Sequence, residues 1–557
     1  RHRGDALLEA LRAGLVTESD VRRCVGNLLS VMERVGALDT EPGPETTNDD
    51  PVDRALIRRA AAAGMVLLRN SPARTGAPVL PLVVAPGTRV AVIGPNAQQC
   101  RALGGGSALV TPTSVSHPLA ALRARLEPLG AVVEHELGCD INKRLAEPPR
   151  ELMSNVTLEV FASPDDLDDS SASPIHVAEP ASLNLMWFED PAGRKGTNFS
   201  FGARFSFDLR ADASGDWTFG VQTVGPARLF VDGELLVDNA SSPSGASFFG
   251  AGREECRGSV SFIAGTNHKV VVDVYQHPGS SNLAGVNIGL GRPVSDDPVG
   301  DAVGLAARSD LAIVVVGTNE DWESEGWDRA DIDLPGEQDR LVREVARVSP
   351  RTIVVVNAGS PVAMPWIDEV DAVLFTWFAG QEMGDAIVDL LFGDVEPQGR
   401  LPVTFPRRIE DTPASEFHPG RGGTAQYREG RLIGYRHFDT VGRTPLFPFG
   451  FGLGYADVTI DRARLVDDFT IDVDLGNATA RDGVAVVQVY AHVVDRSDLP
   501  DDEPDQRLVG FVRFDVPAGR TLNGTVRLDP DAYRFWNTEA DAWDLRTGAV
   551  ELRVATS

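Results

Sequence analysis

The sequence predicts a multidomain protein in which an α/β sandwich carries an inserted all-β domain and is followed by a small β-sandwich. Apolar runs alternate with helical segments in residues 52–149 and again in residues 294–410. Residues 150–293 and residues 456–557 show instead the short alternating runs of antiparallel strands. Because the α/β pattern resumes after residue 293, the all-β segment before it is interpreted as an insertion into a loop.

Residues 1–37 precede this α/β domain and read as two amphipathic helices. Thr17 followed by Asp20 is typical of an N-cap before the second helix. The chain opens within a helix and without Met, so we expect that a segment upstream belongs to the same protein. Residues 38–51 are polar and rich in Pro and Gly, which indicates a linker.

The strands of the α/β domain are predicted from short apolar runs that are rich in β-branched residues. Such runs are typical of parallel strands that are covered on both faces. A glycine-rich loop, Gly104–Ser107, follows the second of them. The predicted strands are residues 66–68, 89–93, 311–316, 352–356 and 372–376, with helices around 52–64, 335–348 and 381–392.

Both all-β regions show alternating polar and apolar residues between turn signals. In the insertion, Asp232-Gly233 favours a tight hairpin turn over a ligand site. Residues 411–455 are the linker to the final domain. The predicted strands are 201–209, 217–221, 227–231 and 268–275 in the insertion and 471–475, 484–490, 509–516, 521–528 and 549–554 in the final domain.

Composition excludes several classes of partner. The 557 residues include 81 acidic and 52 basic side chains, a net charge of −29, which argues against nucleic acid or an anionic membrane and favours a neutral substrate. The four cysteines are widely spaced and suggest neither a disulfide framework nor a zinc site. No apolar run reaches the roughly 20 residues of a membrane span, and with no visible signal peptide we expect a cytoplasmic location.

Residues 317–329 follow a predicted buried strand and combine several acids with Trp322, Trp327, Asp328 and Arg329. Ligands bind at the carboxyl ends of strands in α/β sheets, and carboxylates beside aromatic rings are typical of sugar sites. The two tryptophans are candidates for the sugar platform or the wall of the leaving-group site, the alternative being that one belongs to the core. A second interpretation is a solvent-facing acidic loop in which Asp328 pairs with Arg329.

This loop, Trp322–Arg329 with Asp333–Gly336, resembles the acid/base loop of glycoside hydrolase family 3, the β-glucosidase family. The resemblance implies hydrolysis of terminal β-D-glucosyl or related residues, with glucose or xylose as the sugar and no metal or organic cofactor. Further blocks keep the order of the family. They are Gly94–Asn96, Gly104–Ser107, Gly380–Glu382, Leu391–Asp394, Leu401–Pro406, Gly434–Arg436 and Pro445–Leu453.

The resemblance also implies which carboxylate is catalytic. Glu325, directly before a glycine, matches the general acid/base of the family, and Glu323 is its rival. Crowding by Glu323, Asp321 and Asp328 would raise the pKa of one carboxyl, which suits a group that must hold a proton near neutral pH. The same resemblance makes Trp322, Trp327, Asp328 and Arg329 candidates for substrate binding.

Three further segments resemble modules of the family. The insertion, with Phe219 and residues 228–233, resembles the PA14 module that some members carry here, which implies a preference for compact leaving groups. Residues 456–557 resemble its fibronectin-III-like domain. Residues 1–37 resemble the last helical part of its N-terminal (β/α)8 barrel.

The nucleophile of the family is an Asp in a Ser-Asp-Trp-like motif of that barrel. The only Asp-Trp pairs are Asp216-Trp217, in the insertion, and Asp321-Trp322, in the acidic loop. We therefore expect this chain alone to be inactive, with a separate barrel-bearing chain as a candidate partner. A non-catalytic carbohydrate-binding or accessory protein is the alternative, an adhesin is a weaker one, and the sequence leaves the aglycone and the oligomeric state open.

Overall fold

Residues 4–556 are described by a computed structural model, except for 41–42, 44–46, 72–76, 109, 111, 195–198, 244, 246–247, 249–250, 280–282, 327, 496–501, 538 and 546–547. Contacts divide the chain into two units, Arg1–Asp53 and Arg54–Ser557. The first unit contains α1 (Asp5–Arg12) and α2 (Glu18–Arg34). The second unit contains the α/β domain, the insertion and the final β domain.

The start of α2 confirms the predicted N-cap. Thr17 Oγ1 accepts a hydrogen bond from Asp20 N at 3.1 Å, and the Asp20 carboxylate accepts one from Thr17 N at 3.1 Å. No residue of α1 or α2 is buried. The two helices are amphipathic, as predicted, but their apolar faces do not pack against a buried core within this unit. The exposed apolar side chains are Leu8, Val25, Leu28, Leu29 and Val31.

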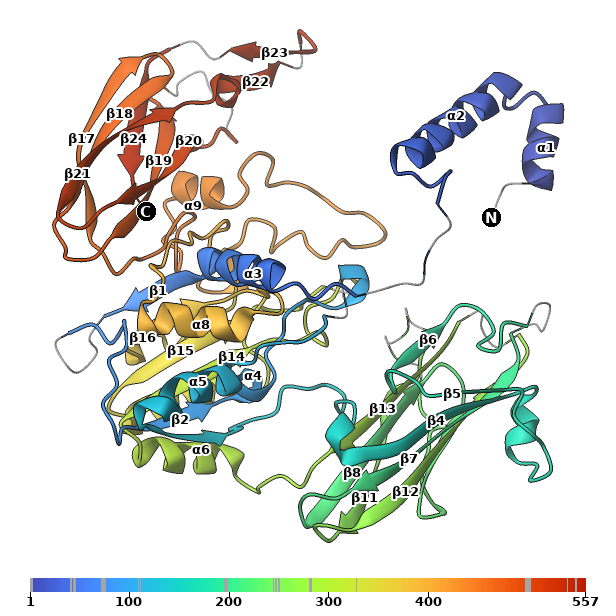
Figure 1. Ribbon diagram of the computed structural model, residues 1–557. Helices are drawn as coiled ribbons and strands as arrows, with labels where there is room; N and C mark the ends of the chain where they lie inside the picture. The colour runs from blue at the N-terminus through green and yellow to red at the C-terminus, as the bar shows by residue number, and fades with distance from the viewer. Residues whose placement is uncertain are drawn as a thin grey trace. The chain divides into compact units, whose positions relative to one another are not determined.

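A six-stranded sheet forms the centre of the α/β domain (Figure 1). Its first strand pairs antiparallel with its neighbour, and all other pairs are parallel. The five predicted strands are confirmed, but Val132–Glu136 was missed because this edge strand, half solvent-facing, carries charged residues. The order is β1 (Val66–Asn70), β16 (Ala372–Phe375), β15 (Thr352–Asn357), β14 (Leu311–Gly317), β2 (Arg89–Ile93) and β3 (Val132–Glu136).

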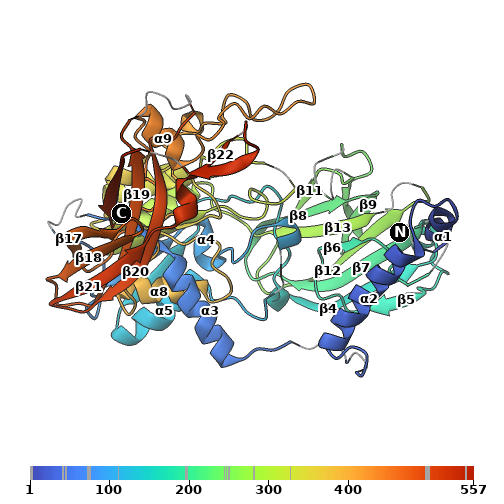
Figure 2. The ribbon, with the colours of Figure 1, turned by 90° about the horizontal axis from the view of Figure 1, so that it is seen from above.

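Helices cover both faces of this sheet, which confirms the expected α/β sandwich (Figures 1 and 2). Alternate strand residues point to opposite faces, so each strand contributes to two separate cores. One core lies under α3 (Pro51–Gly64), α5 (Pro118–Leu126) and α8 (Met383–Phe392). The other lies under α6 (Pro298–Ala307) and α7 (Gln338–Val348).

The strand order reverses between β2 and β14. From β2 the chain continues to β3 on one side, and after the insertion it returns to β14 on the other side of β2. Such a switch point leaves a crevice outside the carboxyl ends of the two strands, where ligands of open α/β sheets bind. The loops that begin at Gly94, after β2, and at Gly317, at the end of β14, meet there.

The insertion is a two-sheet β domain with its own aromatic core, which includes Phe205 and Trp217. The predicted hairpin is confirmed, since Asp232 (φ 51°) and Gly233 (φ 86°) form the turn between β9 and β10. The sheets contain β4 (Met153–Phe161), β5 (His176–Ala178), β7 (Phe201–Arg210), β9 (Ala227–Val231), β10 (Glu234–Asp238) and β12 (Asn267–Gln276), and β6 (Leu185–Trp187), β8 (Gly215–Thr223), β11 (Cys256–Phe262) and β13 (Ala284–Gly291).

The final domain is the expected β-sandwich, with a core that includes Val473, Leu475 and Val487. The linker before it contains α9 (Tyr435–Val441). One sheet holds β17 (Val458–Asp467), β18 (Thr470–Asn477) and β21 (Arg520–Arg527), and the other holds β20 (Gln506–Val516), β19 (Gly483–Val493) and β24 (Val550–Ala555). A separate hairpin, β22 (Arg534–Asn537) and β23 (Ala542–Leu545), was not predicted.

Candidate active site

The acidic loop begins at Gly317, the last residue of β14, which pairs with Asn357 of β15. A Cβ on Gly317 would lie 1.8 Å from the carbonyl oxygen of Asn357, so only glycine fits without moving the strands. The Gln338 side chain holds the same residue by accepting from Gly317 N (2.8 Å) and donating to Gly317 O (2.9 Å). The root of the loop is therefore fixed to both β15 and α7.

Buried amide side chains join the loops at the switch point. Asn96, after β2, donates from Nδ2 to Thr318 O and to Asn357 Oδ1, each at 3.0 Å. The Asn357 Oδ1 atom also accepts from Arg101 N at 2.7 Å. Buried polar groups require hydrogen-bond partners. Beyond the ends of the strands, these side-chain hydrogen bonds take the place of the backbone pairing within the sheet. Three loops are thereby held together.

Glu323 is the most constrained carboxylate of the acidic loop. Its Oε1 accepts from Thr318 Oγ1 (2.5 Å) and Gly359 N (3.0 Å), and its Oε2 accepts from Ser360 Oγ (2.9 Å). The Arg329 guanidinium lies 3.9 Å away, and the Glu323 side chain is only 13% exposed. Three hydrogen-bond donors and a nearby cation therefore hold the two oxygens of Glu323 in place. This carboxylate anchors the loop.

Glu325 is exposed and accepts hydrogen bonds from the glycine-rich loop. The Oε2 atom accepts from Ser107 N at 2.9 Å and from Ser107 Oγ. These two hydrogen bonds lower the pKa of Glu325. The expected rise in pKa through crowding is wrong for Glu325, because the donors of Ser107 stabilise the charged form.

The glycine-rich loop approaches the acidic loop at backbone distance. Gly105 N donates to Glu323 O at 3.0 Å, and Glu325 N donates to Gly105 O at 3.4 Å. Gly106 has φ +84°, and a Cβ there would lie 2.8 Å from the Cβ of Glu325. Glycine is needed for this close approach. The glycine-rich loop was recognised in the sequence, but only the fold shows that it hydrogen-bonds to Glu325.

Trp322 and Asp321 contact the segment before the insertion. The Trp322 indole donates to Ile141 O at 2.6 Å, and the Lys143 ammonium lies 3.9 Å from the centre of its ring. The Asp321 carboxylate accepts from Arg144 Nε at 2.9 Å. In this structure Trp322 therefore secures the loop to a neighbouring segment. Trp327, the other candidate, lies outside the described residues.

Asp328 and Arg329 have different environments. The Arg329 side chain is largely buried, pairs with Glu323 and donates to Asp333 O at 2.9 Å. The Asp328 side chain is 83% exposed, with His418 Nε2 at 3.5 Å. The two residues are thus partnered by other groups, in contrast to the alternative in which they pair with each other.

The insertion reaches the acidic loop through the segment between them. Glu255 Oε1 accepts from Leu145 N at 2.9 Å, and Arg257 donates to Lys143 O at 3.1 Å. Lys143 and Arg144 contact Trp322 and Asp321, so this segment connects the insertion to the loop that bears Glu325.

The described part of the chain contains no group of three or more His, Cys, Asp or Glu residues that could hold a metal ion. Likewise, none of its helices is long and apolar enough to cross a membrane.

Comparison with known proteins bears on the same residues. The profile of the glycosyl hydrolase family 3 C-terminal domain matches residues 65–455. The chain belongs to glycoside hydrolase family 3. The profile of the fibronectin type III-like domain matches residues 485–557 of this family 3 chain, as the sequence led us to expect.

The relatives of this family 3 chain support its assignment as a glycosidase. A β-glucosidase of Rhizobium radiobacter is 37% identical over 573 residues, which are 100% of this chain and 68% of the relative. A probable β-glucosidase J of Aspergillus fumigatus is 33% identical over 584 residues, 98% of this chain and 66% of the relative. The chain therefore spans about two thirds of the length of these relatives.

Solved structures agree with the family. The β-glucosidase from Kluyveromyces marxianus in complex with glucose has a TM-score of 0.87 at 28% identity, over 99% of this chain and 67% of that one. DesR, a β-glucosidase from Streptomyces venezuelae in complex with D-glucose, has a TM-score of 0.69 at 28% identity, over 100% of this chain and 65% of that one. The expected assignment to the glycoside hydrolases is confirmed.

Proposed function

We propose that this chain supplies the acid/base half of a retaining β-glucosidase that hydrolyses terminal non-reducing β-D-glucosyl or related residues. The observation that carries the proposal is the exposed Glu325 carboxylate at the switch point of the sheet, next to a Glu323 carboxylate that is immobilised. The β-glucosidase names of the relatives support the substrate class.

Glu325 suits the acid/base role better than Glu323. A general acid/base must exchange its proton with a substrate oxygen, so it must be reachable and able to exist in both protonation states. Glu325 is exposed and accepts hydrogen bonds from Ser107. Glu323 is instead only 13% exposed, and both of its oxygens are already engaged by Thr318, Gly359 and Ser360.

Neither Asp-Trp pair supplies a candidate for the nucleophile. A retaining glycosidase needs a second carboxylate about 5 Å from the acid. Trp217 is fully buried in the core of the insertion, and the Asp321 carboxylate is paired with Arg144. We propose that the nucleophile and the residues that grip the sugar come from a barrel beyond this sequence, and that α1 and α2 pack their exposed apolar faces against it.

The insertion is proposed to be a PA14-like module that shapes the leaving-group site. Its Glu255 and Arg257 hydrogen-bond to the segment that holds Trp322 and Asp321. A domain so close to the acid/base loop would limit the space for the aglycone. Substrates with compact leaving groups are therefore expected to be preferred.

The isolated chain is expected not to hydrolyse p-nitrophenyl β-glucoside, because the proposed nucleophile lies on a barrel beyond this sequence. Co-expression with the barrel-bearing segment of the same protein is expected to restore turnover, measured as released nitrophenolate. Turnover by the pure chain alone would show that the nucleophile lies within these 557 residues. Sugar binding without turnover in both preparations would favour the non-catalytic alternative.

Replacing Ser107 with alanine is expected to shift the pH profile of the complete enzyme. The Ser107 hydroxyl lowers the pKa of Glu325, so its removal raises that pKa. Because the first step needs Glu325 protonated, the basic limb of kcat/KM should move to higher pH. Ser107→Thr keeps a hydroxyl and serves as the control. An unmoved limb in Ser107→Ala would show that this hydrogen bond is absent from the working enzyme.

A further inference from the structure

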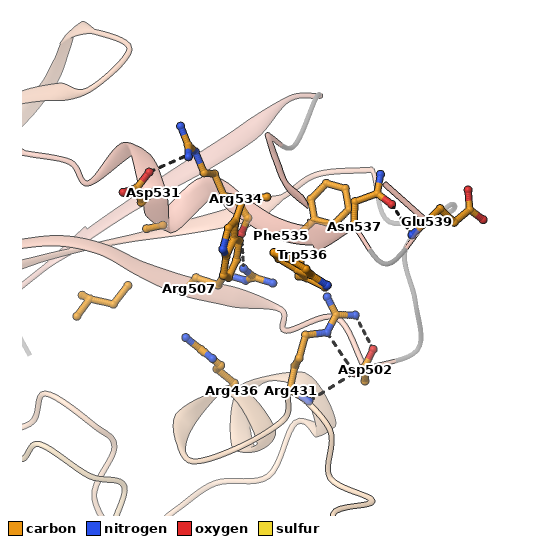
Figure 3. A pocket seen from close by; sticks show the side chains of 13 residues that line it. Arg431, Arg436, Asp502, Arg507, Asp531, Arg534, Phe535, Trp536, Asn537 and Glu539 are labelled. Carbon is orange, nitrogen blue, oxygen red and sulfur yellow. Dashed lines mark hydrogen bonds and ion pairs between the residues drawn. The ribbon is translucent and has the colours of Figure 1, made fainter. Parts of the chain in front are cut away.

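A cavity of about 870 Å³ lies far along the chain from the acidic loop, between the linker and the final β domain. Figure 3 shows Arg431 rising from the linker toward Trp536 of the β22–β23 hairpin, with Arg436 beside it on the same linker segment. Trp543 of the same hairpin also lines it. The family assignment gives this cavity no role, and its lining combines aromatic rings with guanidinium groups.

The two tryptophans are unusually exposed for their size. Trp536 is 47% and Trp543 63% exposed, and they are cross-strand partners in the hairpin. Their ring centres lie 5.6 Å apart at an interplanar angle of 79°. Each ring supports the other edge-on, which leaves indole surface in contact with solvent. Indole faces of this kind bind the C–H faces of sugar rings.

Three of the four arginines in the cavity are paired with carboxylates. Arg431 binds Asp502 through Nη2 (2.5 Å) and Nε (3.1 Å). Arg507 donates to Glu503 at 3.0 Å. Arg534 lies 3.2 Å from Asp531. These pairs fix the shape of the cavity wall and neutralise most of its positive charge.

Arg436 differs from these three. Its guanidinium lies 5.9 Å from the ring centre of Tyr435, and its Nε is buried without a hydrogen-bond partner. Within the described residues, no carboxylate forms an ion pair with it. A buried donor without a partner is costly, and a protein with a net charge of −29 has many acids that could have supplied one. Arg436 is therefore the lining arginine for which the described residues supply no carboxylate, although the exposed Glu539 also lines the cavity. An incoming anion would meet the terminal nitrogens of its guanidinium.

We propose that this cavity binds a saccharide that carries a carboxylate, such as a uronic acid residue within an oligosaccharide. A sugar ring would stack on Trp536 or Trp543, and the carboxylate would accept from the guanidinium of Arg436. The planar guanidinium matches a carboxylate with two parallel hydrogen bonds. Such a site would hold the enzyme on an acidic polysaccharide while the active site, elsewhere, cleaves glucosides.

The test is calorimetric titration of the chain with tri-galacturonate, cellotriose and a sulfated trisaccharide. Wild type is expected to bind tri-galacturonate at least tenfold more tightly than cellotriose. Arg436→Gln should lose that preference by about tenfold or more, since a hydrogen bond to a charged group is worth about 1.5–3 kcal/mol. The double variant Trp536→Ala/Trp543→Ala should lose binding of both saccharides.

Arg534→Gln is the matched control. The guanidinium of Arg534 already pairs with Asp531, so its removal should leave the preference for tri-galacturonate intact. The thermal transition of each variant shows whether the final domain remains folded. Equal affinity for acidic and neutral saccharides, or an unchanged preference in a folded Arg436→Gln, would overturn the proposal. Tighter binding of the sulfated trisaccharide would overturn the carboxylate assignment. None of these readings depends on hydrolysis, so they are independent of the proposed glucosidase activity.

Discussion

Glu325→Ala in the complete enzyme is expected to lower kcat for β-glucosides by about 10²–10⁴-fold, the usual contribution of general acid–base catalysis. The loss should be largest for substrates with poor leaving groups, because these need a proton on the departing oxygen. With an aryl glucoside of good leaving group, added azide should restore turnover, since azide attacks the glycosyl intermediate without a general base. The measurement is kcat with and without azide, with the glycosyl azide product identified.

Glu323→Gln is the companion variant that separates anchoring from catalysis. The amide keeps the shape but removes the charge opposite Arg329, and its NH2 group faces donors instead of accepting from them. Activity is expected to fall through loss of loop position, together with a lower thermal midpoint and without azide rescue. Rescue at position 323 and none at position 325 would reverse the two assignments.

Gly317→Ala is expected to have the largest effect on stability among substitutions in the acidic loop. The added methyl would lie 1.8 Å from the carbonyl oxygen of Asn357, so β14 and β15 would have to separate. Overpacking of this kind costs about 3 kcal/mol. Differential scanning calorimetry should show a lower midpoint for the α/β domain, and activity should fall because the loop root moves.

Gly326→Ala provides the matched control for this substitution. A Cβ at Gly326 meets no atom of the described residues within 4 Å, although the residue directly follows Glu325. Its effect on stability is expected to stay within about 0.5 kcal/mol. If Gly317→Ala has the thermal midpoint of the wild type, β14 and β15 can separate without a loss of stability. The acidic loop would then be held less rigidly at Gly317 than the contacts indicate.

Most elements of the fold could be predicted because their signals are local. The β-branched runs of β2, β14 and β15 are buried on both faces, so they are apolar throughout. The cap at Thr17 and the turn at Asp232 depend on residues at most three positions apart. The edge strand β3 was missed because its partly exposed residues do not need to be apolar.

The sequence by itself determined the family, the α/β and β domains and the loop that carries the carboxylates, because these depend on short patterns that each segment contains in full. Only the tertiary structure showed which groups each carboxylate contacts. Glu323 and Glu325 lie two residues apart, but Gly359 is 36 positions from the first and Ser107 is 218 positions from the second. Hydrogen bonds from such distant residues anchor one carboxylate and lower the pKa of the other, and no local pattern encodes them.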